Sequence, residues 1–136
     1  MKGFGKTDIG NLRTNNEDSI FVSNDAIGDL PNLYIVADGM GGHNAGEIAS
    51  SESIRYFCEY IKNNSCGEDI LDFIIGATTY TNNQIFFESK EKKEFLGMGT
   101  TFSVCVIDKN KIFIVHVGDS RIYLIDESKM EQITTD

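Results

Sequence analysis

The chain has 136 residues, a length that suits one domain, and it is 40% hydrophobic and 24% charged, as folded proteins usually are. Its formal net charge of −9 argues against nucleic acid or an anionic membrane as the main partner, because both repel an acidic surface. No run approaches the roughly 20 apolar residues of a membrane span, and residues 1–10 lack the apolar segment of a signal peptide. We therefore expect one domain over residues 1–136 and no membrane partner.

The first half of the chain predicts two strands followed by two helices. Residues 18–24 alternate weakly between polar and apolar side chains, and residues 32–38 form the continuous apolar run of a buried strand. From residue 44 to about residue 63, small or apolar residues recur every four positions, which is the spacing of an amphipathic helix. A second helical pattern begins near Gly67 and ends in a charged, solvated stretch.

In the second half the apolar period changes to that of strands. Residues 99–108 and 111–119 flank Lys109 and Asn110 and predict a hairpin, and residues 120–126 and 130–135 predict another. Strands that run in blocks, instead of alternating one by one with helices, favour an α+β fold over a doubly wound α/β sheet.

The three cysteines, Cys58, Cys66 and Cys105, are odd in number and lack the C-x-x-C spacing of zinc or redox sites. This usage predicts reduced thiols in a cytoplasmic protein rather than a disulfide framework. Cys58 and Cys105 stand among apolar residues, so we expect both in the core.

The stretch ADGMGGH begins with Asp38, which stands at the end of the apolar run at residues 32–38. No lysine followed by Ser or Thr comes after its glycines, and their spacing is not G-x-G-x-x-G, so both common nucleotide loops are excluded. The carboxylate of Asp38 beside a carbonyl at Gly39 offers the oxygen ligands that hard divalent cations prefer. A plain Asp-Gly turn explains this segment equally well when it is taken alone.

Two further clusters carry charge. Arg13 precedes the adjacent acids Glu17 and Asp18, an arrangement that suits cation binding beside an arginine able to grip phosphate. A charged surface turn is the alternative. Asp119 follows an apolar strand and a glycine, and it stands close enough to Arg121 in sequence to form a structural ion pair instead.

Taken together, these stretches resemble the metal-dependent protein phosphatases of the 2C type (PP2C), especially the small bacterial serine/threonine phosphatases. The resemblance rests on residues 10–19, 36–50, 97–107 and 117–125, in the family's order. It implies a four-layer αββα sandwich, in which two antiparallel sheets are flanked by helices. It also implies dephosphorylation of phosphoserine and phosphothreonine proteins by a hydroxide that two Mn²⁺ or Mg²⁺ ions activate.

The resemblance assigns metal ligands residue by residue. Asp38 matches the aspartate that bridges the two ions, the Gly39 carbonyl completes one shell, and Glu17 contributes to the same ion. Asp119 matches an acid that helps to bind a third, weaker ion in bacterial members. The cysteines have no part in this chemistry.

Other residues receive supporting roles from the same resemblance. Asp18 would hydrogen-bond the metal-bound waters, and Arg13 would hold the substrate phosphate. His43 is a candidate proton donor to the leaving oxygen, whereas His116, inside an apolar strand, is predicted to be core. The segment at residues 97–101 is predicted to be structural, with glycines that let strands pack closely.

The sequence departs from the family because two further metal-binding aspartates do not follow Asp119. We therefore expect the N-terminal part of a phosphatase domain, with impaired catalysis by this chain alone. Exposed strand edges and apolar faces predict a homo-oligomer or a strand-exchanged dimer. A non-catalytic or degenerate domain that binds phosphoproteins or metal is the alternative. A phosphoprotein substrate and an opposing serine/threonine kinase are the partners that the resemblance implies.

Overall fold

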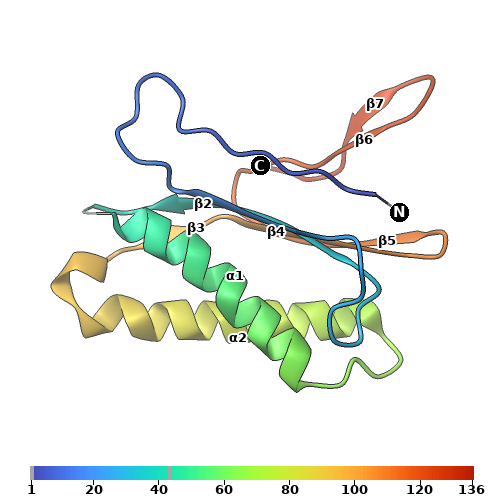
Figure 1. Cartoon of the computed structure of the whole chain (residues 1–136), viewed down its shortest axis with the longest axis horizontal. Helices are drawn as coiled ribbons and strands as arrows, with labels where there is room; N and C mark the ends of the chain where they lie inside the picture. The colour runs from blue at the N-terminus through green and yellow to red at the C-terminus, as the bar shows by residue number, and fades with distance from the viewer. Residues whose placement is uncertain (1, 43) are drawn as a thin grey trace.

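The computed structural model describes residues 2–42 and 44–136, and it places two long helices against one face of a five-stranded antiparallel sheet (Figure 1). The strands of this sheet are β1 (Asp18–Ser23), β2 (Leu33–Met40), β3 (Gly99–Thr100), β4 (Phe102–Asp108) and β5 (Lys111–Val117). The helices are α1 (Ala45–Asn63), α2 (Ile70–Glu91) and the short 3-10 helix η1 (Lys93–Phe95). Strands β6 (Tyr123–Ile125) and β7 (Met130–Gln132) pair with each other as a separate hairpin.

The predicted order of two strands, two helices and two hairpins is confirmed, as is the α+β class. The second helix begins at Ile70 rather than at Gly67, because the side chain of Asp69 accepts a hydrogen bond from the Asp72 amide and caps the helix there. The turn between β4 and β5 contains Lys109 with a φ of 55°, which gives this two-residue connection the left-handed backbone that a tight hairpin requires.

The core lies between the sheet and the helices. The strands run in the order β1-β2-β4-β5, and residues opposite one another across β2 and β4 include Ile35 and Val104. Because side chains alternate along a strand, one face of the sheet is mostly apolar and packs on the helices. That core includes Leu33, Ile35, Ala37, Phe57, Ile61, Ile74, Phe102, Val104 and Val106, all of which are buried.

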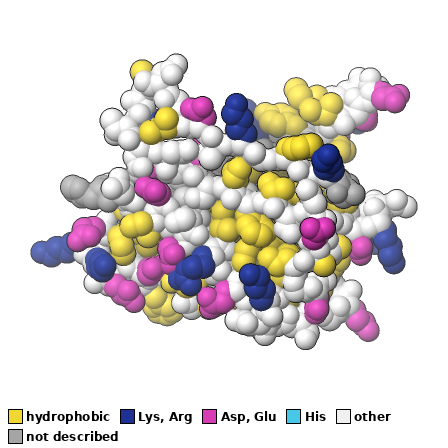
Figure 2. All heavy atoms as spheres, in the orientation of Figure 1, with side chains coloured by type: hydrophobic (Ala, Val, Ile, Leu, Met, Phe, Trp, Pro, Cys, Tyr) yellow, Lys and Arg dark blue, Asp and Glu magenta, His cyan; other side chains and the backbone are white. Residues whose placement is uncertain are grey.

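The opposite face of the sheet, called the open face below, has no helix over it (Figure 1). By strand register it carries the apolar side chains Ile20, Val22, Tyr34, Val36, Cys105, Ile107, Ile112 and Ile114. Val36 is 49% exposed and Ile112 is 48% exposed. The N-terminal segment covers one corner, where Gly3 lies against Tyr34. The β6–β7 hairpin lies on this side too, and Figure 2 shows hydrophobic side chains exposed along it.

The cysteine predictions are met in part. Cys58, Cys66 and Cys105 are all free thiols, as expected, and Cys58 is buried. Cys105 is only half-buried because β4 turns this side chain toward the open face and not toward the helices. Neither α1 nor α2, the two long helices of the described chain, contains an apolar stretch of the length that a bilayer crossing needs.

Candidate metal and phosphate site

Asp18 and Asp38 stand directly opposite each other on β1 and β2, at one end of the open face. Both side chains are exposed, and the two residues are direct partners in the pairing of β1 with β2. Partial burial, the charge of Asp18 and a hydrogen bond with it, and the charges of Asp119 and Glu17 all raise the pKa of Asp38 above its ordinary value. Four carboxylates therefore share one electrostatic environment, and a bound cation would relieve their repulsion.

A polar pocket of about 210 Å³ opens beside this pair. It is lined by Asp8, Ile9, Arg13, Asn15, Asn16, Glu17, Asp18, Asp38 and Gly39. The structure therefore brings the predicted Arg13, Glu17, Asp18, Asp38 and Gly39 into one pocket. These residues come from the loop before β1, from β1 itself and from the end of β2, so the sheet pairing of β1 with β2 assembles the pocket.

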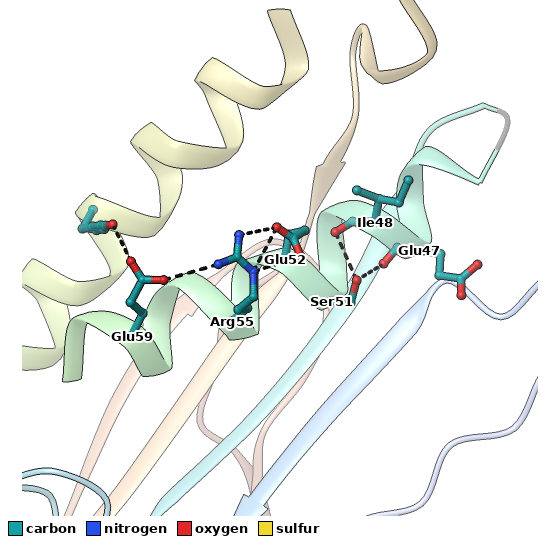
Figure 3. A network of polar contacts seen from close by, with 7 residues as sticks. Glu47, Ile48, Ser51, Glu52, Arg55 and Glu59 are labelled. Carbon is teal, nitrogen blue, oxygen red and sulfur yellow. Dashed lines mark hydrogen bonds and ion pairs between the residues drawn. The ribbon is translucent and has the colours of Figure 1, made fainter. Parts of the chain in front are cut away.

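Arg13 is the arginine best placed to meet an anion in this pocket. It is exposed, and in residues 2–42 and 44–136 no ion pair or hydrogen bond occupies its guanidinium. Arg55 is occupied on α1, where it contacts Glu52 at 2.6 Å and Glu59 at 3.3 Å (Figure 3).

The ion pair considered between Asp119 and Arg121 does not form. Arg121 instead binds Asp136, with its Nε 3.0 Å from both carboxylate oxygens. This pairing lowers the pKa of Asp136, chiefly through the hydrogen bond from Arg121. Asp119 is left free of this arginine and close enough to raise the pKa of Asp38.

The backbone of Glu17 is held tightly where β1 begins. Its carbonyl accepts hydrogen bonds from the Gly39 amide at 3.0 Å and from the Ser50 hydroxyl of α1 at 2.7 Å. Ser50 also shares a hydrogen bond of 2.8 Å with Ser19 of β1. The two hydrogen bonds to the Glu17 carbonyl hold its backbone, and with it the side chain, next to the end of β2.

Two glycines allow close approach at this corner, and one of them leaves room for the Glu17 carboxylate. A Cβ added at Gly39 would overlap the carbonyl oxygen of Gly46, and one added at Gly46 would overlap Glu17 Oε2. Sequence reasoning gave Gly46 no role. The sequence did contain a signal for this role, because Gly46 stands in the first turn of a helix, where glycine costs stability relative to alanine.

Glu17 Oε2 is buried and has no hydrogen-bond partner in the described chain. A buried carboxylate oxygen without a donor costs free energy that a cation would offset. With the Asp38 carboxylate and the Gly39 carbonyl nearby, the donors are all oxygens, the set that Mg²⁺ and Mn²⁺ prefer. The residues present thus fit a divalent ion of this kind.

The predicted ligands nevertheless do not surround an ion by themselves. Within the described residues, no three His, Cys, Asp or Glu side chains already lie close enough together to hold a metal ion. Glu17, Asp18, Asp38 and Asp119 approach one another without enclosing an ion, so backbone carbonyl and water would have to supply further ligands.

Three expectations for neighbouring residues need comment. His43 lies outside the described residues. His116 is half-buried rather than core, with Nδ1 2.8 Å from Ser103 Oγ and Nε2 2.8 Å from the Gly118 carbonyl oxygen. The glycines of residues 97–101 do not serve close packing, which is a correction: Gly97 has open space around it and a φ of 76°, and Gly99 has only ordinary contacts.

An acidic, oxygen-rich site beside a free arginine, on an α+β fold, is typical of proteins that act on phosphate groups with the help of metal ions. The family model for protein phosphatase 2C matches residues 11–136. The chain therefore belongs to the protein phosphatase 2C family.

Relatives support the same assignment. The serine/threonine phosphatase Stp of Listeria welshimeri is 35% identical over 136 residues, which cover 96% of this chain and 52% of that protein. The catalytic domain of the serine/threonine phosphatase PstP, in complex with two manganese ions, superposes with a TM-score of 0.81 at 35% identity, covering 96% of this chain and 54% of that one. Stp1 from Staphylococcus aureus gives a TM-score of 0.85 at 31% identity, with coverages of 96% and 52%. The chain thus spans about half the length of these relatives.

Proposed function

We propose that the protein is a metal-dependent phosphatase that dephosphorylates phosphoserine and phosphothreonine in proteins. The observation that carries this proposal is that Arg13, Glu17, Asp18 and Asp38 line the same polar pocket. Relatives named serine/threonine phosphatase, one of them holding two manganese ions, support the choice of reaction and metal.

The proposed ligands are the Asp38 carboxylate, the Gly39 carbonyl and Glu17 for two Mn²⁺ or Mg²⁺ ions, with Asp119 for a third and weaker ion. When bound, such ions lower the pKa of a water so that it can attack phosphorus at neutral pH, and they offset developing negative charge. Asp38 stands opposite Asp18 on the neighbouring strand and close enough to Asp119, beyond β5, to feel its charge, which suits a ligand shared by two ions.

Two residues complete the proposed site without binding metal. Asp18, across the strand pair from Asp38, is placed to accept hydrogen bonds from water in the pocket and so to orient it. Arg13 has its full fork of donors available for the oxygens of a phosphate, an arrangement that favours planar, two-point binding. Among the described residues that line this acidic pocket, Arg13 is the one that carries a positive charge.

Isothermal titration of Mn²⁺ into the protein, followed by hydrolysis of a phosphothreonine peptide with and without EDTA, tests the proposal. We expect wild type to bind Mn²⁺, and Asp38→Ala to weaken binding about a hundredfold. The matched control is Glu127→Ala, which removes an exposed acid near the β6–β7 turn, away from the pocket lining, and should leave binding unchanged. Equal Mn²⁺ affinity in wild type and Asp38→Ala would refute the assignment.

The second candidate function is a non-catalytic domain that binds phosphoprotein or metal. The open ligand set favours it, because no three acidic or histidine side chains of the described chain hold an ion without additional groups. Mn²⁺ and phosphopeptide binding without EDTA-sensitive hydrolysis would select this function over the phosphatase.

The open face supports a homo-oligomer. The chain exposes 8761 Å², whereas a compact monomer of its mass should expose about 7,100 Å². The excess of about 1,700 Å² is more than the ~800 Å² that each partner buries in a standard interface. We therefore propose that a second copy covers the apolar part of this face.

Light scattering tests this dimer. The dimer should become more stable as salt is added, because each chain carries a charge of −9 and salt screens the repulsion between the two copies. A monomer at about 100 µM would exclude the dimer.

Partners and location follow from the same proposal. A phosphoprotein is the proposed substrate, and a serine/threonine kinase that modifies it is the proposed opposing enzyme. We place the protein in the cytoplasm because Cys58, Cys66 and Cys105 are all free thiols, which a reducing compartment preserves.

A further inference from the structure

The hydrogen bonding between β2 and the β3–β4 segment is irregular at one position, Thr101. The pairings of Gly39 with Thr100 and of Val36 with Ser103 belong to one register, which sets Asp38 opposite Thr101. The Thr101 amide donates to the Asp38 carbonyl at 2.9 Å, as a regular ladder requires. The Asp38 amide, however, donates to the Thr101 hydroxyl oxygen at 2.9 Å instead of to the Thr101 carbonyl.

The Thr101 carbonyl is satisfied from another side. It accepts a hydrogen bond of 2.7 Å from the hydroxyl of Thr100. The side chain of Thr101 has therefore taken the place of a main-chain acceptor at the residue that carries the central carboxylate of the site. Strand propensity alone explains a threonine at this position, but it does not explain this exchange of acceptors.

The same hydroxyl reaches the turn that carries Asp119. Thr101 Oγ1 lies 2.7 Å from Ser120 Oγ. Because Thr101 Oγ1 accepts from the Asp38 amide, its own proton is available for Ser120. Gly118, with a φ of 105°, packs so closely that an added Cβ would lie 2.7 Å from the methyl carbon of Thr101. The turn that carries Asp119 therefore packs against the Thr101 side chain.

We propose that Thr101 and Ser120 are positioning residues that hold Asp38 and Asp119 in a fixed relation across the open end of the site. The chain of contacts runs from the Asp38 amide through the two hydroxyls to the residue next to Asp119. This inference rests on the proposed function for its consequence, metal affinity, but the link itself is a property of the polypeptide. Two residues outside the polar pocket would thereby affect the binding of an ion within it.

The link is tested by hydrogen exchange of the Asp38 amide, followed by NMR without metal. Thr101→Val keeps the shape of the side chain and removes the hydroxyl, so exchange at Asp38 should become about tenfold faster. Thr101→Ser keeps the hydroxyl and should stay within about threefold of wild type. The matched control is Thr78→Val, which removes an equally half-buried hydroxyl that donates to Ile74 on α2 at 2.8 Å. It should leave the Asp38 amide unchanged.

The consequence is tested by Mn²⁺ titration of the same proteins. We expect Thr101→Val to weaken affinity about tenfold and Thr101→Ser to restore it. Ser120→Ala should weaken it less, and the double variant should be no weaker than Thr101→Val, because both changes break one link. Unchanged Asp38 exchange in Thr101→Val, or a Thr101→Ser variant as impaired as Thr101→Val, would overturn the inference. Absence of Mn²⁺ binding in wild type would overturn the proposed function instead, and the exchange experiment would still decide the link.

Discussion

The fold encloses one part of the proposed site and leaves another part exposed. The corner formed by Glu17, Gly39 and Gly46 is enclosed by β1, β2 and α1. A Cβ at Gly39 would overlap backbone atoms, and a Cβ at Gly46 would overlap the Glu17 carboxylate. Arg13, by contrast, is an exposed residue on the loop before β1. The proposed metal-binding corner is therefore set by packing, whereas the arginine proposed to bind phosphate is free to adjust to its ligand.

The largest effect that would test this comparison comes from Gly39→Ala. The added Cβ meets the backbone of Gly46 and Glu17, which cannot move without separating β1, β2 and α1. We expect a loss of about 3 kcal/mol in the free energy of unfolding, measured by urea denaturation. Gly42→Ala, in the loop that follows β2, is the control, since its Cβ would meet open space. If both variants are equally stable, the corner is not rigid.

Gly46→Ala should have a smaller effect on stability and a selective one on the metal. Its Cβ chiefly meets the end of the Glu17 side chain, which can swing away. We expect about 1 kcal/mol of destabilisation together with about tenfold weaker Mn²⁺ binding, measured by denaturation and calorimetry. Wild-type Mn²⁺ affinity in this variant would show that Glu17 need not occupy its buried position.

Asp38, the exposed acid next to the enclosed corner, should also affect stability through pH. The folded-state pKa of Asp38 lies above its ordinary 3.8, so its contribution to stability is complete below pH 3.8 and is lost as the pH rises through the folded-state pKa. In EDTA, Asp38→Asn should therefore gain stability relative to wild type between about pH 4 and pH 7, by a few tenths of a kcal/mol because the group is exposed. A stability difference that does not change with pH would contradict the repulsion inferred at this carboxylate.

The smallest effect on stability is expected at the exposed part of the site. Arg13→Ala should change the free energy of unfolding by less than about 0.5 kcal/mol, because nothing in the described chain is bound to its guanidinium. It should weaken binding of inorganic phosphate in the presence of Mn²⁺, with Arg55→Ala as the control on α1. Strong destabilisation by Arg13→Ala would mean that this loop is as firmly packed as the enclosed corner.

The order of strands and helices could be predicted from the sequence, as could the position of Asp119 just after a strand, because local periodicity and turn residues depend only on near neighbours. The predicted strand end at Asp38 was wrong, since β2 continues to Met40 through its pairing with β3. The resemblance of the sequence to a phosphatase family also pointed to Arg13, Glu17 and Asp18, which the fold brings into one pocket. The sequence could not show that Asp136 rather than Asp119 binds Arg121, that Gly46 makes room for Glu17, or that Thr101 links Asp38 to Ser120. These contacts join residues 15 to 63 positions apart or pack an α-helix on a strand end. Such residues are brought together by sheet register and helix packing, not by local sequence pattern, so these contacts become visible only in the folded structure.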